Sequence, residues 1–282
     1  MNPGTESQPV LRAREPSPLA GHVVVLTGAS EGIGRALALE LARRGLCLVL
    51  AARNQQRLEE VARAVEAAGS AALVVPTDVL DPAQCRALID ATVAHFGSLD
   101  VLINNAGGTM WSRFDALEDL APYEHLMRLN YLSAVYLTFA ALPWLKQSQG
   151  RIVAIASVAG LTGVPERSGY AASKHAMIGF FESLRIELAA SEVTVTIIAP
   201  DFVRSEIHKR ALGPDGRALG ASPMRQERIM TAEKCAQLIV PAIELRRRLL
   251  ITSLRGRLGR WLKLLAPSLI DRIAARAIRE RH

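Results

Sequence analysis

The sequence has few aromatic residues and few cysteines, and the shortage of cysteine argues against a disulfide-stabilised protein and against a zinc-binding one. Three cysteines, Cys47, Cys85 and Cys235, are spread over 282 residues. An odd number of scattered cysteines without a Cys-x2-Cys pair argues against a disulfide framework and against a zinc site. We therefore expect a reducing, cytoplasmic environment and no bound metal.

Long uncharged apolar runs are also missing. No window of about 18 apolar residues without charge occurs, so no transmembrane helix is predicted. The first 20 residues are rich in proline, serine and charge, and they lack the apolar segment of a signal peptide. This composition predicts a disordered N-terminal tail over residues 1–20.

Acidic residues are scarce at the C-terminal end. The net charge is +7 at pH 7, and residues 255–282 hold eight Arg or Lys against two acids, which leaves +6 there and +1 elsewhere. Apolar residues recur between these cations at helical spacing: Leu254, Leu258, Trp261, Leu262 and Leu265, then a second set after Pro267. The pattern predicts a basic amphipathic extension over residues 254–282.

Two kinds of surface would suit this extension. A basic amphipathic helix with a tryptophan fits the surface of an anionic membrane, and it equally fits packing against protein. Nucleic-acid binding is not expected, because no recognition motif accompanies the basic residues.

The rest of the chain alternates between short β-branched runs and longer amphipathic runs. Half of all residues are hydrophobic, which is enough for a large core. Strands are expected at 22–27, 46–51, 72–76, 100–103, 151–156, 193–198 and 249–252, with helices between them that include 117–130 and 131–146. This order predicts an α/β fold with a single doubly wound parallel sheet, helices on both faces, over residues 21–253.

A glycine-rich turn follows the first expected strand. Gly28, Gly32 and Gly34 lie between that strand and the next helix, with Ser30 and Ile33 in the same turn. Glycine lets the backbone approach a pyrophosphate, which then sits at the positive end of the helix. The spacing is Gly-x3-Gly-x-Gly rather than Gly-x-Gly-x2-Gly, but the strand–turn–helix context predicts a dinucleotide site.

The second strand ends without the acidic residue of an NAD-specific site. Ala52 and Arg53 stand there instead, and an arginine suits the 2′-phosphate of NADP(H). A solvated arginine is the alternative interpretation, and Glu31 in the glycine turn would disfavour a nearby phosphate. We predict NADP(H) as the cofactor.

Polar residues also follow the third and fourth strands. Asp78, with Val79 after it, either caps the next helix or bonds to an adenine amino group. The turn Asn104–Gly108, which includes Ala106 and Gly107, suits packing around a cofactor as well as it suits an ordinary turn.

Three residues after the fifth strand suggest proton transfer. Ser157 follows an apolar run, and Tyr170 and Lys174 are spaced i, i+4 on one helix face. A free tyrosine is a poor acid or base at neutral pH. An ammonium about 4 Å away favours the phenolate by roughly 1–4 kcal/mol, which makes proton transfer near pH 7 feasible. A serine hydroxyl at the strand end could hold a carbonyl oxygen.

Taken together, these motifs resemble those of the short-chain dehydrogenase/reductase family, from about Gly21 to Thr252. The matching positions are Thr27–Gly34, Asp78, Asn104–Gly107, Asn130, Ser157, Tyr170 and Lys174.

The resemblance implies a role for each catalytic position. Tyr170 would be the general acid/base, Ser157 would hold the substrate oxygen, and Lys174 would assist the tyrosine and bind the nicotinamide ribose. Asn130 on its own is typical of a buried, satisfied asparagine, but the resemblance makes it the holder of a relay water. Asp78 would contact adenine.

The same resemblance implies cofactor contacts beyond the glycine turn. Asn104 and Gly107 would line the cofactor, and Pro200, Val203 and Ser205 fit a segment beside the nicotinamide. The family often has Pro-Gly where this chain has Pro200 and Asp201, so the loop conformation is open. The irregular residues 202–228 suit a lid over the substrate.

We therefore predict an NADP(H)-dependent oxidoreductase that interconverts a ketone and a secondary alcohol on a hydrophobic, lipid- or steroid-like substrate. One alternative is a cofactor-binding scaffold or sensor without turnover. Another is a membrane-surface protein whose extension is its main functional element. The resemblance also implies a homo-oligomer, dimer or tetramer.

Overall fold

The computed structural model describes residues 17–223 and 229–279, and within them seven parallel strands form one sheet in the order β3-β2-β1-β4-β5-β6-β7. The strands are β1 (Val23–Thr27), β2 (Cys47–Ala52), β3 (Ala72–Pro76), β4 (Val101–Asn104), β5 (Arg151–Ile155), β6 (Thr194–Ala199) and β7 (Leu249–Ile251). Most of their residues are aliphatic, as expected for strands buried on both faces. The predicted single doubly wound parallel sheet is confirmed.

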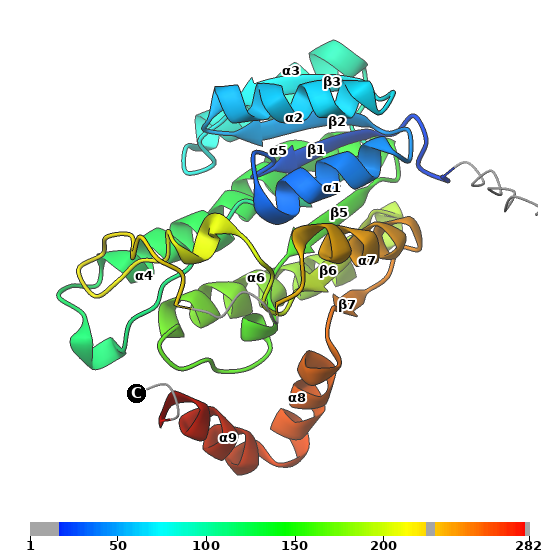
Figure 1. Ribbon diagram of the computed structural model, residues 1–282. Coiled ribbons are helices and arrows are strands. Elements are labelled where there is room, and N and C mark those ends of the chain that lie inside the picture. Colours follow the sequence, from blue (N-terminus) through cyan, green and yellow to red (C-terminus); the bar gives the residue numbers. More distant parts are fainter. Residues whose placement is uncertain (1–16, 224–228, 280–282) are drawn as a thin grey trace, which may run out of the picture.

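Helices cover both faces of the sheet (Figure 1). One layer contains α1 (Gly32–Ala42), α2 (Gln55–Ala67) and α7 (Ala232–Glu244), and the other contains α3 (Pro82–Phe96), α5 (Ser133–Gln147) and α6 (Ser168–Glu187). Successive strand residues point to opposite layers. In β1, Val24 and Leu26 pack with the first layer, whereas Val23 and Val25 pack with the second.

The prediction of a helix over residues 117–130 is wrong about where the helix begins. Helix α4 spans Ala121–Met127 and runs through a π-helical turn, Arg128–Leu132, directly into α5. Pro122 lies in the first turn of α4. Proline is favoured there and disrupts a helix farther in, which explains the late start.

The folded part begins before the predicted boundary at residue 21, so the expected tail is too long by four residues. Leu19 is fully buried, and Ser17 Oγ donates a 2.7 Å hydrogen bond to Glu244 Oε1 at the end of α7. Burying a leucine stabilises a fold by about 1.5–3 kcal/mol, which explains why residues 17–20 belong to the domain. The other tail residues, 1–16, lie outside the described part.

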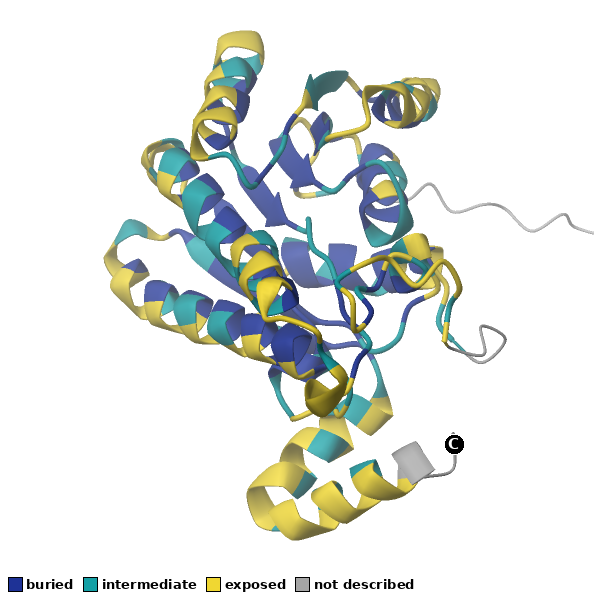
Figure 2. Ribbon diagram, turned by 90° about the vertical axis from the view of Figure 1, so that its left-hand side faces the viewer, coloured by how far each residue is buried: buried dark blue, intermediate teal, exposed yellow. Residues whose placement is uncertain are grey.

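A helical hairpin follows β7 at the C-terminal end. It consists of α8 (Leu254–Leu265) and α9 (Pro267–Arg279), and Ser253 caps α8 by accepting a 3.0 Å hydrogen bond from the N–H of Gly256. Figure 2 shows that most of the hairpin is exposed. Across the described residues, no helix combines the length and the apolar character needed to span a bilayer.

The strand order determines where ligands can bind. The chain moves outward from β1 through β2 to β3, and then restarts on the other side of β1 with β4. In open parallel sheets, the crevice at the carboxyl ends of such strands is the usual ligand site. A ligand site is therefore expected at the edge where β1 and β4 end.

Candidate active site

A cavity of about 1110 Å³ lies at the carboxyl ends of the strands. Sites for a single small ligand usually measure about 300–1,000 Å³, so this cavity has room for a dinucleotide and a substrate together. Its lining includes most of the predicted site residues: Gly28, Ser30, Gly32, Ile33, Gly34, Arg53, Asp78, Val79, Ala106, Gly107, Ser157, Tyr170, Lys174, Pro200, Val203 and Ser205. Asn104 and Asn130 do not line it.

The glycine turn has the shape that a pyrophosphate requires. Gly28 and Gly32 have φ values of +64° and +52°, a region that favours glycine. A Cβ on Gly34 would lie 2.0 Å from the carbonyl oxygen of Gly28. No side chain caps the start of α1 at Glu31, so the first N–H groups of this helix are available to an anion in the cavity.

Thr27 and Asn105 hold this turn against the end of β4. Thr27 Oγ1 accepts hydrogen bonds from the N–H groups of Asn105 and Ala106, both at 3.0 Å. The Asn105 side chain donates back to the carbonyl oxygen of Thr27 at 2.8 Å. These bonds tie the two strand ends together beside the cavity.

Three arginines line the cavity near the end of β2. Arg53 follows that strand, Arg57 lies in α2, and Arg210 comes from the segment after β6. The carboxylate of Glu31 pairs with Arg57 at 2.9 Å and with Arg210. The charge of Glu31 is thus compensated, and the local balance of these four side chains is positive.

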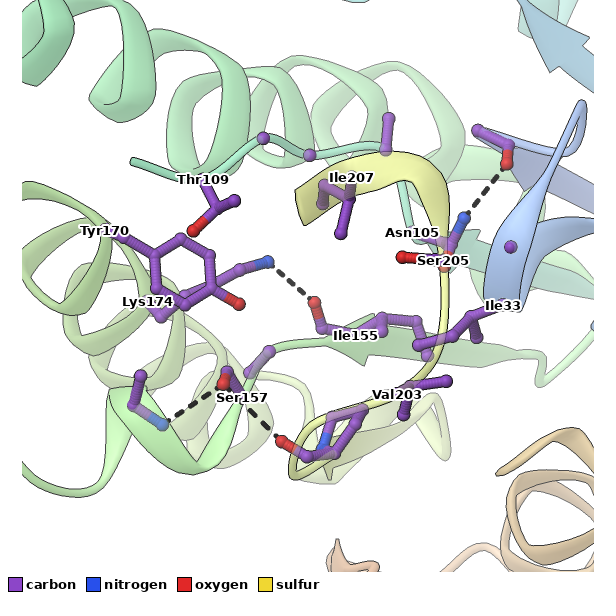
Figure 3. Close-up of a pocket in the computed structure, with 18 of the residues that line it drawn as sticks. Ile33, Asn105, Thr109, Ile155, Ser157, Tyr170, Lys174, Val203, Ser205 and Ile207 are labelled. Carbon is purple, nitrogen blue, oxygen red and sulfur yellow. Dashed lines mark hydrogen bonds between the residues drawn. The ribbon is translucent and has the colours of Figure 1, made fainter. Parts of the chain in front are cut away.

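Ser157, Tyr170 and Lys174 are turned into the same part of the cavity (Figure 3). Ser157 caps a short 3-10 turn, Val158–Gly160, by accepting a 3.1 Å hydrogen bond from the N–H of Ala159. Tyr170 and Lys174 lie one turn apart on α6. The Lys174 ammonium donates a 2.8 Å hydrogen bond to the carbonyl oxygen of Ile155, at the end of β5.

Lys174 is a buried cation without a carboxylate partner among the described residues. Only 4% of Lys174 is exposed to solvent, and burial lowers the pKa of its ammonium from 10.5 to about 7. Desolvation penalises the charged form of an amine. Lys174 can therefore hold or release a proton near neutral pH, beside Tyr170.

Asn130 and Asn104 lie behind the cavity wall. The Asn130 side chain accepts from the N–H of Gly108 at 2.8 Å, and donates to the Gly108 carbonyl at 3.1 Å and to Ser173 Oγ at 2.8 Å. Asn104 donates to Thr138 Oγ1 at 3.2 Å. Asn130 thereby positions the chain beside Gly107, where a Cβ would lie 2.8 Å from its Oδ1.

Asp78 lines the cavity, and its carboxylate also stabilises the local turn. Its Oδ1 accepts a 3.0 Å hydrogen bond from the N–H of Leu80. The helix cap itself is Asp81, which accepts from the N–H of Ala83. Asp78 is thus free of the capping role that the sequence also allowed.

Two polar side chains that no sequence motif indicated line the same cavity as Tyr170. The guanidinium carbon of Arg167 lies 4.3 Å from the ring centroid of Tyr170, and its Nη2 donates to Thr109 Oγ1 at 2.7 Å. His208 is buried, and burial together with the nearby Arg167 lowers the pKa of its imidazole. Both come from irregular segments whose positions depend on tertiary packing.

His208 has a defined orientation. Its Nε2 is 3.2 Å from the carbonyl oxygen of Val203, which can only accept, so Nε2 carries the proton. Its Nδ1 has no hydrogen-bond partner within the described residues. It is therefore a buried acceptor in the lining of the cavity.

Comparison with known proteins places these features in a family. The family model "short chain dehydrogenase" matches residues 22–213. The chain is 40% identical over 260 residues to "11-beta-hydroxysteroid dehydrogenase 1A" of Arabidopsis thaliana, covering 90% of this chain and 74% of that relative. It is 38% identical over 259 residues to "11-beta-hydroxysteroid dehydrogenase A" of Sesamum indicum, with the same coverage.

Solved structures agree with this. A short-chain dehydrogenase/reductase from Burkholderia phymatum in complex with NAD has a TM-score of 0.78 at 28% identity, covering 89% of this chain and 95% of that one. An alcohol dehydrogenase from Thermococcus sibiricus complexed with 5-hydroxy-NADP has a TM-score of 0.72 at 25% identity, covering 82% and 95%. The chain belongs to the short-chain dehydrogenase/reductase family of nicotinamide-dependent oxidoreductases.

Proposed function

We propose that this protein is an NADP(H)-dependent enzyme that interconverts a ketone and a secondary alcohol on a hydrophobic, steroid-like substrate. The observation that carries the proposal is that Ser157, Tyr170 and Lys174 enter one cavity together with the glycine turn. The relatives named as 11-beta-hydroxysteroid dehydrogenases support the substrate class.

The choice of NADP(H) depends on charge. The ribose end of the cavity carries Arg53, Arg57 and Arg210 around a single carboxylate, Glu31. A 2′-phosphate would find a positive environment there, whereas a 2′-hydroxyl would lack the acid that usually binds it. The solved relatives include one with NAD and one with an NADP derivative, so family membership alone does not decide between the cofactors.

The catalytic side chains would divide the work as follows. The bound nicotinamide supplies or accepts the hydride. Ser157 orients the substrate oxygen, and Tyr170 gives a proton to that oxygen during reduction and takes it back during oxidation. The carbonyl oxygen of Ile155 holds the Lys174 side chain in place. While Lys174 is protonated, its charge stabilises the phenolate form of Tyr170, and Lys174 can also return a proton to that phenolate.

Replacing Tyr170 with phenylalanine tests the proton transfer. Tyr170→Phe removes the donor and leaves the ring, so we expect kcat/KM for ketone reduction to fall by about 10²–10⁴. Steady-state kinetics with NADPH measure the fall, and fluorescence titration with NADPH verifies that the variant still binds cofactor. Turnover near that of the unmodified protein would rule out the mechanism. Cofactor binding without any turnover by the unmodified protein would favour the scaffold.

Replacing Arg53 tests the cofactor preference. Arg53→Ala should weaken NADPH binding about tenfold or more and leave NADH binding nearly unchanged, because only NADPH carries the phosphate. Fluorescence titrations with both nucleotides measure this, and Arg63→Ala, on the exposed side of α2, is the matched control. A preference of the unmodified protein for NADH would contradict the proposal and make Arg53 a surface charge.

The burial of Lys174 predicts a dependence of stability on pH. Between pH 7 and 10.5 the unfolded chain binds more protons than the folded one at this side chain, so the free energy of unfolding rises with pH in this window. Lys174→Met removes this titration along with activity. The free energy of unfolding of Lys174→Met should exceed that of the unmodified protein by more at pH 6 than at pH 10. The difference between the two pH values should be on the order of a few kcal/mol.

Urea unfolding at the two pH values measures the difference. Lys146→Met, on the exposed end of α5, is the control and should show no such pH dependence. Equal effects of Lys174→Met at both pH values would mean that the ammonium keeps its full charge when folded.

We also propose that the outer face of the hairpin α8–α9 contacts an anionic membrane surface. Leu254, Leu258, Trp261 and Leu265 point outward, with between 64% and 81% of each exposed. No other described part of the chain covers them. Basic residues alternate with them along the sequence of α8, and the positive charge of this helix favours insertion of the apolar side chains beside anionic headgroups.

Vesicle sedimentation tests this contact. We expect the protein to sediment with phosphatidylglycerol-containing vesicles at low salt, less so as salt screens the charges, and not when Leu258 and Leu265 are both changed to Glu. Leu245→Glu, an equally exposed leucine after α7, is the control and should leave sedimentation intact. Absence of the unmodified protein from the vesicle pellet would exclude the membrane contact.

A further inference from the structure

The hairpin also has an inner face, which returns to the cavity. Gly256 and Gly259 of α8 and Ile270 of α9 line the cavity that holds Tyr170. These residues lie about 85–100 positions beyond Tyr170 in the sequence, and their part of the chain follows the last strand of the sheet. The extension is therefore part of the wall of the candidate active site.

Asp201 fastens α8 in this position. Its carboxylate, 11% exposed, accepts hydrogen bonds from Arg255 Nη2 at 2.7 Å, Arg255 Nε at 3.1 Å and Ser253 Oγ at 2.7 Å. Burial opposes ionisation of this carboxyl, but the bonds from Arg255 and Ser253 outweigh burial and hold its pKa below the usual value. Asp201 stands where the family often has glycine, which has no side chain to make these bonds.

Two further contacts hold the helix against the loop after β5. A Cβ on Gly256 would lie 2.7 Å from Val158 Cγ1 and 2.8 Å from Ile251 Cγ2, so only glycine permits this approach. The ammonium of Lys263, two turns farther along α8, donates a 2.9 Å hydrogen bond to the carbonyl oxygen of Leu161. Helix α8 is thus anchored at its start, at its inner face and near its end.

Gly259 differs from Gly256 in its surroundings. A Cβ at Gly259 would meet only Ile270 Cδ1, at 3.9 Å, and the residue lines the cavity. The space in front of it is therefore open. A side chain added at this position would extend into room that a ligand could use.

We propose that the inner face of α8 at Gly259 is the far wall of the substrate site, that it receives the end of an elongated apolar substrate distant from the reacting carbonyl, and that Asp201 positions this wall. The inference deepens the proposed function and rests on it for the reaction. It assigns Gly259 as a residue that determines specificity and Asp201 as a positioning residue.

The first test fills the space. Gly259→Leu should reduce the ratio of kcat/KM for a large ketone, the 11-ketosteroid cortisone, to that for a small one, cyclohexanone, by about tenfold or more, since overpacking a filled site is costly. Ser268→Leu, which adds the same side chain at an exposed position of α9 outside the cavity, is the matched control. A ratio that is the same in Gly259→Leu and Ser268→Leu would overturn the assignment of Gly259.

The second test releases the wall. Asp201→Asn removes the charge that holds Arg255, so the amide hydrogens of α8 should exchange faster with deuterium and the same ratio should fall. Arg272→Gln, which removes a charge at an exposed position of α9, is the control and should leave both the exchange of α8 and the ratio unchanged. Unchanged exchange in Asp201→Asn would show that Asp201 does not position α8.

Equilibrium dialysis separates failure of this inference from failure of the proposed function. In the presence of NADP⁺, cortisone should bind the unmodified protein more tightly than cyclohexanone does, and Gly259→Leu should remove most of this advantage. Absence of any ketone reduction, with the binding difference intact, would refute the proposed reaction alone. Equal binding of the two ketones by the unmodified protein would refute the far wall, whether or not either is reduced.

Discussion

The molecule depends on one junction, where the ends of β1 and β4 are tied together by Thr27 and Asn105. Thr27 accepts from two backbone N–H groups of the turn after β4, and Asn105 returns a bond to the Thr27 carbonyl. Asn105 Nδ2 also lies 3.3 Å from the Gly28 carbonyl, so the glycine turn is shaped by the neighbouring strand. The strand order reverses at this point. One junction therefore positions the start of α1, the cavity, and the turn after β4 that Asn130 supports.

The site is built at a cost to stability that the fold accepts. A lysine buried without a carboxylate loses hydration that a single carbonyl bond only partly replaces. In exchange for this loss, burial lowers the pKa of the Lys174 ammonium to about 7, one helical turn from Tyr170. Reactive groups in many enzymes have such shifted pKa values. Here the shift follows from the packing of α6 against β5, which buries the Lys174 side chain.

The sequence predicted what depends on local pattern and missed what depends on packing. Strand positions came within one residue, because aliphatic runs buried on both faces leave a continuous signal. Arg167 and His208 lie in irregular segments without periodicity, so only the structure brings Arg167 to Tyr170 and His208 into the lining of the same cavity. Asp201 stood out as a departure from the family, but its partners lie more than 50 residues away. The homo-oligomer that the family resemblance implies stays a prediction; Phe139 and Ile186 are exposed on α5 and α6.

The two proposals about the C-terminal hairpin concern opposite faces of the same two helices, and this has a physical consequence. Gly256 and Gly259 face the cavity, whereas Leu254, Leu258 and Leu265 face outward. A membrane that binds the outer face would restrain α8 from outside, while Asp201 restrains it from inside. If the membrane binds α8 in the position that Asp201 holds, the two restraints would reinforce each other. An apolar substrate dissolved in that membrane would then be concentrated beside the wall of the site that receives it.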